Sequence, residues 1–245
     1  MANRLVKWWR DWRHKARVRR FYADFVRPGE WVFDVGAHIG SRTRTFLELG
    51  AQVVSVEPQN ECARSLFVHF YKNPRFHLVN KALGAQDGRA ELYNNKARNS
   101  CATLSRSWIE RSAVRQGIWQ ESMWMEPSMV AVTTLDQLIA EFGRPCFAKI
   151  DVEGYEYPVI QGLSQCIPAL SLEFHTLYLE PVWQSLDYLT RFGEMHLNYA
   201  VAEKFEWMLP EWVSLREMTT ILQGIPINSP IRYGDVYVRF IEPSL

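Results

Sequence analysis

The sequence predicts an α/β fold in which helices cover both faces of a mostly parallel sheet. Short apolar runs of four to six residues alternate with longer amphipathic segments through the first 175 residues, which is the pattern of βαβ units. The runs are nearly continuously apolar, as expected for strands that are buried on both faces. A Gly-rich turn follows the first run, and ligands bind at such turns in open α/β sheets.

Five of these runs predict the strands of the parallel part, and the segments between them predict helices. The expected strands span residues 31–35, 53–56, 76–79, 146–150 and 169–174. The expected helices span residues 41–49, 61–71, 134–142 and 155–163. Gly50 and Gly143 follow the first and third of these helices, where a left-handed glycine commonly ends a helix.

The last third of the chain has a different pattern. Residues 199–202 and 236–240 predict two further strands, and residues 213–222 predict a helix between them. We expect residues 196–241 to form an antiparallel ribbon on the edge of the sheet.

The segment at residues 94–128 has no clean period, and it combines polar residues with Trp108, Trp119 and Trp124. Long irregular segments in compact domains are commonly functional. We therefore expect a lid on the side of the site where a second substrate enters, with a plain insertion as the alternative.

The composition is that of an ordinary globular protein. Of 245 residues, 47% are apolar and 22% are charged, close to the usual proportions. No apolar run approaches the ~18 residues of a membrane-spanning helix. The chain has a net charge of +1, but residues 1–20 contain eight basic residues and one acid, so the remaining 225 residues carry a net charge of −6. This charge argues against a nucleic-acid partner, because such proteins usually carry a basic patch on the fold itself.

Residues 1–27 are expected to form a basic, Trp-rich helical arm that precedes a domain at residues 28–245. On a helix, Leu5, Trp12 and Ala16 share one face with Trp8 or Trp9. Such a helix commonly packs on its own domain or on a subunit partner. The alternative is peripheral contact with an anionic membrane, which basic amphipathic helices with Trp can make.

The cysteines predict a reducing compartment. They are far apart and match no Cys-x-x-Cys zinc or redox pattern; they are Cys62, Cys101, Cys146 and Cys166. The basic N-terminus also lacks the apolar segment of a secretion signal. We therefore expect a cytoplasmic protein that is at most peripheral to a membrane.

The first motif that indicates chemistry is the turn at residues 32–41, which reads Val-Phe-Asp-Val-Gly-Ala-His-Ile-Gly-Ser. Asp34 lies at the end of a strand, and Gly36 and Gly40 precede a helix. Glycines let the backbone approach a ligand, and a helix N-terminus favours negative charge. The spacing differs from the G-x-G-x-x-G of dinucleotide sites. It suits a ligand with an ammonium for Asp34 and a carboxylate for the backbone N–H groups, and a methionyl group has both.

Two further motifs follow later strands. Glu57 and Pro58 end the second strand, where an acid about 20 residues after the turn can accept hydrogen bonds from a ribose. Asp151 and Glu153 end the fourth strand over the same crevice. These two carboxylates could orient an amino group, act as a general base or hold a metal; either could instead cap the helix that follows.

Taken in order, these motifs resemble the FkbM-type methyltransferases, which use S-adenosylmethionine (SAM). The resemblance rests on the segments at residues 32–40, 56–58, 80–88, 134–136 and 149–154, and it ends near residues 172–174. It implies a class I methyltransferase (Rossmann-like) fold, with a seven-stranded, mostly parallel sheet whose last strand is antiparallel. The expected ribbon at the end of the chain agrees with that topology.

The resemblance also implies roles for individual residues. The cofactor-binding residues would be Asp34, Gly36, His38 and Gly40 at the methionyl end, Glu57 and Pro58 at the ribose, Ala82, Leu83 and Gly84 near the adenine, and Asp151 near the amino group and the methyl. His38 stands where family members have Asn, so it either keeps the hydrogen bonding of that side chain or titrates near neutral pH and reaches the acceptor.

We therefore expect a SAM-dependent O-methyltransferase that acts on a hydroxyl of a sugar, a glycan or a specialised metabolite and releases S-adenosylhomocysteine (SAH). A hydroxyl acceptor must lose its proton, and the candidate catalytic residues are Asp151, His175 and Glu153. We assign no metal ligand, although Asp151 and Glu173 could share a divalent ion. The alternatives are a catalytically silent scaffold or membrane-associated partner with the same fold, and an NAD-dependent oxidoreductase, which the missing dinucleotide motif disfavours.

Overall fold

The computed structural model describes residues 13–96, 101–116, 124–226 and 229–241, with only the backbone of residues 112–116. The seven-stranded sheet has the order β3-β2-β1-β7-β8-β10-β9. Its parallel strands are β1 (Trp31–Val35), β2 (Gln52–Val56), β3 (Phe76–Val79), β7 (Phe147–Ile150) and β8 (Ala169–His175). The five strands expected in the parallel part are thus confirmed to within one residue at each end.

The C-terminal strands complete the sheet. β10 (Tyr233–Phe240) is antiparallel to both β8 and β9 (Met195–Val201). The expected antiparallel ribbon is present, but β10 lies inside the sheet between β8 and β9, so of these two strands β9 alone lies at an edge. The order and the direction of the last strand confirm the expected class I topology.

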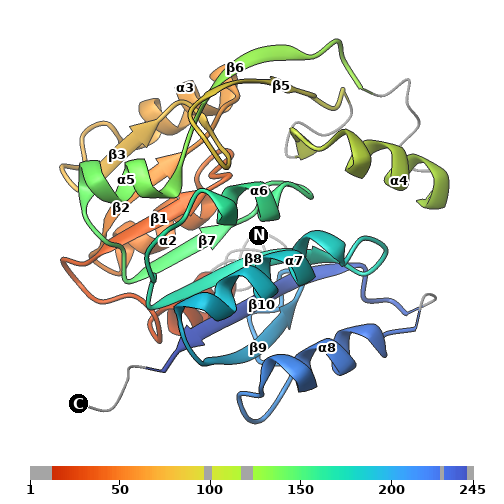
Figure 1. Cartoon of the computed structure of the whole chain (residues 1–245). Helices are drawn as coiled ribbons and strands as arrows, with labels where there is room; N and C mark the ends of the chain where they lie inside the picture. Colours follow the sequence, from red (N-terminus) through yellow and green to blue (C-terminus); the bar gives the residue numbers. More distant parts are fainter. Residues whose placement is uncertain (1–12, 97–100, 117–123, 227–228, 242–245) are drawn as a thin grey trace, which may run out of the picture.

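Helices cover both faces of the sheet (Figure 1). One face packs against α5 (Leu135–Phe142), α6 (Glu156–Gln161), α7 (Glu180–Leu189) and α8 (Leu215–Gln223). The other face packs against the helix at residues 13–22, α2 (Ser41–Glu48) and α3 (Asn60–Phe70). In β1, Val32 faces one core and Phe33 the other, which explains why the strands read as continuous apolar runs.

The part of the N-terminal arm that the structure describes is packed into the domain. Phe21, Tyr22 and Phe25 are buried against strand residues such as Phe147 and Tyr237. Residues 1–12, which include the tryptophans of the expected amphipathic face, lie outside the described residues. From residue 13 onward, the arm is therefore packed into the core of the domain.

A small second sheet lies above the carboxyl ends of the main strands (Figure 1). It has the order β4-β6-β5, formed by Ala82–Leu83, Ser128–Thr133 and Gly88–Leu92. The irregular segment expected at residues 94–128 contains α4 (Arg106–Gln116). Trp108 of α4 is buried against His175, with ring centroids 4.2 Å apart, so this segment is anchored at the end of β8.

Candidate functional site

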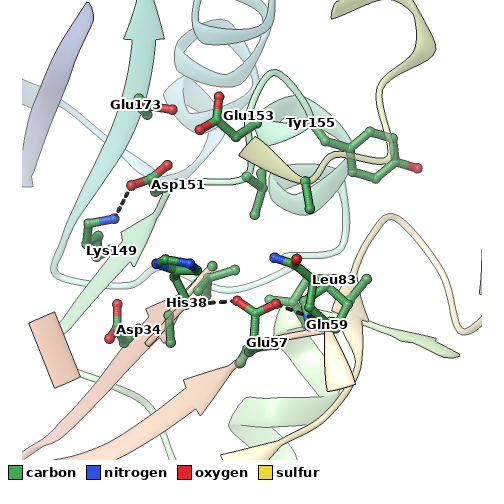
Figure 2. Close-up of a pocket in the computed structure, with 18 of the residues that line it drawn as sticks. Asp34, His38, Glu57, Gln59, Leu83, Lys149, Asp151, Glu153, Tyr155 and Glu173 are labelled. Atoms are coloured by element: carbon green, nitrogen blue, oxygen red, sulfur yellow. Dashed lines mark hydrogen bonds and ion pairs between the residues drawn. The ribbon is translucent and has the colours of Figure 1, made fainter. Parts of the chain in front are cut away.

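A cavity opens at the carboxyl ends of β1, β2, β7 and β8, where parallel α/β sheets bind their ligands. It is lined by most of the residues singled out in the sequence, including Asp34, Gly36, Glu57, Leu83 and Asp151. In Figure 2, three acidic side chains, Asp151, Glu153 and Glu173, gather on one side of the cavity, and Leu83 and Tyr155 lie on the other. The cavity thus has a charged end and an apolar end.

The Gly-rich turn brings the backbone of β1 against the backbone of β7. Gly36 has φ +77, and a Cβ atom on it would lie 1.8 Å from the backbone oxygen of Asp151. Gly40 has φ +88, and a Cβ atom on it would lie 2.5 Å from Phe70 and 2.7 Å from Leu66. Gly36 therefore shapes the cavity wall, whereas Gly40, which does not line the cavity, lets α2 pack on α3.

Asp34 is 1% exposed and lies at the charged end. Its Oδ2 accepts a hydrogen bond of 2.6 Å from the hydroxyl of Thr43, and its Oδ1 has no hydrogen-bond partner. Burial raises the pKa of the Asp34 carboxyl above its ordinary value, against the opposing charges of Lys149 and Arg42. A buried oxygen without a partner is costly, so Oδ1 has unused acceptor capacity, which the expected methionyl ammonium would satisfy.

Glu57 is held rigidly at the middle of the cavity. Its Oε2 accepts a hydrogen bond from the His38 amide, and its Oε1 accepts one from the Gln59 amide, both of 2.8 Å. Burial raises the pKa of Glu57, and these hydrogen bonds oppose that effect. His38, whose amide donates the first of these hydrogen bonds, has a left-handed backbone with φ +49. His38 also lines the cavity.

We expect Glu57→Gln to weaken binding of SAH by about 10- to 100-fold, because a carboxylate hydrogen bond contributes about 1.5–3 kcal/mol and the new amide NH₂ would face one of the two backbone donors. The measurement is isothermal titration of both proteins with SAH and with adenine. Adenine has no ribose, so its affinity should change little; an equal loss for both ligands would contradict the ribose assignment.

The apolar end is formed by three parts of the chain. Leu83 follows β3, Tyr155 precedes α6, and Ala102 and Leu104 come from the segment at residues 94–128. Gly84 does not line the cavity; a Cβ atom on it would lie 3.0 Å from Val132 of β6. The expected lid segment therefore contributes to the wall opposite the charged end, in addition to its contact with His175.

Lys149 occupies the floor of the charged end and was not predicted as a site residue. Its side chain is 5% exposed, and its Nζ lies 2.6 Å from Asp151 Oδ2. Burial alone would raise the pKa of Asp151, but the charge of Lys149 and its hydrogen bond to Asp151 outweigh burial and lower that pKa. Asp151 is therefore a carboxylate at neutral pH.

Glu153, Glu173 and His175 form a cluster next to Asp151. His175 Nε2 lies 3.2 Å from Glu173 Oε2 and 3.5 Å from Glu153 Oε2, and all three side chains are less than one-fifth exposed. Glu153 reaches this position from a left-handed backbone with φ +54. One ligand atom from each residue lies within 4.8 Å of the others, so this set could hold a divalent cation. The sequence suggested a different pair of metal ligands, Asp151 and Glu173, but in the structure Asp151 is paired with Lys149.

The fold, the Gly-rich turn and the acid at the end of β2 define the class of SAM-dependent methyltransferases. The model of the methyltransferase FkbM domain matches residues 34–204, which is more than half of the chain. The protein therefore belongs to the FkbM methyltransferase family, it is a methyltransferase, and its cofactor is SAM. The resemblance noted in the sequence is confirmed.

Individual proteins give weaker similarities. A curated ribosomal RNA small subunit methyltransferase A from Synechococcus sp. (strain JA-2-3B'a(2-13)) is 45% identical over 69 residues, which cover 27% of this chain and 24% of that protein. Two solved structures are similar over most of their length. An rRNA methylase from Streptococcus thermophilus has 9% identity, a TM-score of 0.44 and coverage of 92% of this chain and 95% of that chain. A precorrin-6Y C5,15-methyltransferase from Geobacter metallireducens has 9% identity, a TM-score of 0.48 and coverage of 92% and 86%.

Within the described residues, none of the helices combines the length and the apolar character needed to span a bilayer.

Proposed function

We propose that the protein transfers the methyl group of SAM to a hydroxyl oxygen of a sugar, a glycan or a specialised metabolite. The observation that carries this proposal is the cluster of Glu153, Glu173 and His175. Its two glutamates line the cavity together with Asp34 and Asp151, and His175 contacts both of them without lining the cavity itself. A hydroxyl needs a base as it attacks, and an imidazole held by carboxylates is suited to that role.

In the proposed reaction, the acceptor oxygen forms a bond to the methyl carbon as the bond between that carbon and sulfur breaks. The hydroxyl proton passes through the carboxylate of Glu153, which lines the cavity, to His175 Nε2, and SAH leaves with a neutral sulfur. The donor is already activated, so alignment of oxygen, carbon and sulfur supplies much of the catalysis. Glu153 and Glu173 stabilise the imidazolium that forms, and Asp151 adds a negative charge beside the reacting centre.

The proposal predicts a pH profile. Burial alone would lower the pKa of His175, but the carboxylates of Glu173 and Glu153 outweigh it and raise that pKa well above 6.5. The base is active only when neutral, so the rate should rise with pH through a pKa above 6.5. We expect His175→Gln to lower kcat by about 10²- to 10⁴-fold and to remove this rise. SAH affinity should be nearly unchanged, and a retained pH dependence in the variant would contradict the assignment.

A small acceptor is favoured over a nucleic acid. The relatives named above include enzymes that act on ribosomal RNA, but residues 21–245 carry a net charge of −6, and RNA binding is dominated by contacts of basic residues with phosphates. We extend the proposal to cytoplasmic location, with any membrane contact made by the N-terminal arm at the membrane surface.

The experiment that tests the proposal begins with isothermal titration of the protein with SAM, SAH and NAD, and continues with a screen of hydroxylated sugars and metabolites using methyl-labelled SAM. Binding of the two adenosyl ligands, followed by label in an ether-linked product, is the expected result. Binding without label in any acceptor would favour the silent scaffold, and label in RNA or on nitrogen would overturn the O-methyltransferase proposal.

A further inference from the structure

Arg42 lies in the first turn of α2, directly after the Gly-rich turn, and lines the cavity. Its side chain is 14% exposed. Its Nη2 donates to both carboxylate oxygens of Glu203, at 2.7 and 2.6 Å, and the guanidinium lies 4.5 Å from the ring centroid of Phe205. Arg42 Nε is buried and has no hydrogen-bond partner.

The ion pair between Arg42 and Glu203 lacks the usual bidentate geometry, in which two guanidinium nitrogens donate. Arginine binds a carboxylate best with two nitrogens donating to two oxygens, whereas here one nitrogen of Arg42 serves both oxygens of Glu203. Burying Nε without a partner costs free energy. The guanidinium therefore retains donor capacity that a second carboxylate could use.

The surroundings point to an anion at this place. Among the described residues that line the cavity, the cations are Arg42, Lys81 and Lys149. Lys149 is paired with Asp151, and Lys81 directly precedes the apolar wall at Ala82. The N-terminus of α2 also has no side-chain cap, and uncapped N–H groups attract negative charge.

The same end of the cavity holds Asp34, whose buried Oδ1 has no partner. An anion-binding arginine and a carboxylate with a free oxygen together match an amino acid zwitterion, in which an ammonium and a carboxylate are attached to one carbon. SAM carries such a group on its methionyl chain, and the adenine wall lies at the opposite end.

We propose that Arg42 binds the carboxylate of the methionyl chain of SAM and that this carboxylate displaces Glu203. The inference rests on the assignment of the cavity as the cofactor site. Glu203 is 57% exposed, so water readily solvates it after displacement. Glu203 lies in the turn after β9, between Ala202 and Phe205, both of which have left-handed backbones. In the proposed complex, the carboxylate of the ligand takes the place of the Glu203 carboxylate as the partner of Arg42.

The test uses two ligands that differ in the group of interest. SAH contains the amino acid, and 5′-methylthioadenosine contains the nucleoside and sulfur without it. Isothermal titration measures both ligands with the wild type, Arg42→Gln, Glu203→Gln and the control Arg44→Gln. Arg44 is on the same helix and contacts the Phe70 ring, but it does not line the cavity. Arg44→Gln therefore removes the same charge as Arg42→Gln without removing a cavity side chain.

We expect Arg42→Gln to weaken SAH by about 10- to 100-fold, the range for a charged hydrogen-bonded pair, and to leave 5′-methylthioadenosine unchanged. Glu203→Gln removes the competing carboxylate and should strengthen SAH alone. Arg44→Gln should change neither ligand. Equal effects of Arg42→Gln on both ligands, or no effect on SAH, would overturn the role of Arg42. If the wild type bound neither ligand, the assignment of the cavity would fail, and this inference with it.

Discussion

Gly36→Ala is expected to abolish detectable binding of SAH. The added Cβ would lie 1.8 Å from the backbone oxygen and 2.9 Å from the backbone carbon of Asp151. No rotamer change can relieve this collision because both atoms belong to the main chain. The Gly-rich turn and the end of β7 would have to separate, and both form the charged end of the cavity. We expect a loss of affinity of more than about 100-fold, which corresponds to about 2.7 kcal/mol.

Gly29→Ala is the matched control. Gly29 has φ +85, close to the φ of +77 at Gly36, but a Cβ atom on it would meet nothing within 4 Å. Both variants carry the cost of a left-handed alanine, about 1–2 kcal/mol, and only Gly36→Ala adds the collision. Titration with SAH and thermal unfolding of the two variants separate the effects. Similar SAH affinities for the two variants would show that the close approach of the β1 and β7 ends is unimportant.

The main sheet was predictable because its signal is local. Each parallel strand is buried on both faces, so its apolar run stands out against its neighbours. The second sheet was not predicted, since β4 has two residues and β5 is Gly-Arg-Ala-Glu-Leu, with most of its residues exposed. Such short or polar strands are defined by their partner β6, whose paired residues lie between 36 (Leu92–Ser128) and 50 (Ala82–Val132) positions further along the chain.

The site was predictable where the chemistry falls at the end of a strand. Asp34, Glu57 and Asp151 line one cavity because parallel strands bring their carboxyl ends together. Lys149 and Arg42 were not predicted, since their roles depend on partners contributed by other elements. A signal for Lys149 was present: a lysine inside an apolar strand must be buried, and buried charges require a partner.

Asp151→Asn is expected to lower kcat by about 100-fold or more while changing SAH affinity by less than about 10-fold. In the proposed reaction, the larger effect on kcat follows because the carboxylate of Asp151, held by Lys149, places a negative charge beside the reacting centre, where positive charge develops only in the transition state. Binding depends in addition on Asp34, Glu57 and the apolar wall. Single-turnover transfer and SAH titration provide the two measurements.

The variant also leaves the Lys149 ammonium buried without its carboxylate, and breaking a buried pair costs about 3–5 kcal/mol of stability. The double variant Lys149→Met with Asp151→Asn removes both charges, so the thermal unfolding temperature should recover toward that of the wild type. If kcat stays low in the refolded double variant, the carboxylate itself is needed for transfer. If kcat recovers together with stability, the loss in Asp151→Asn came from the unpaired lysine, and Asp151 has no direct part in the reaction.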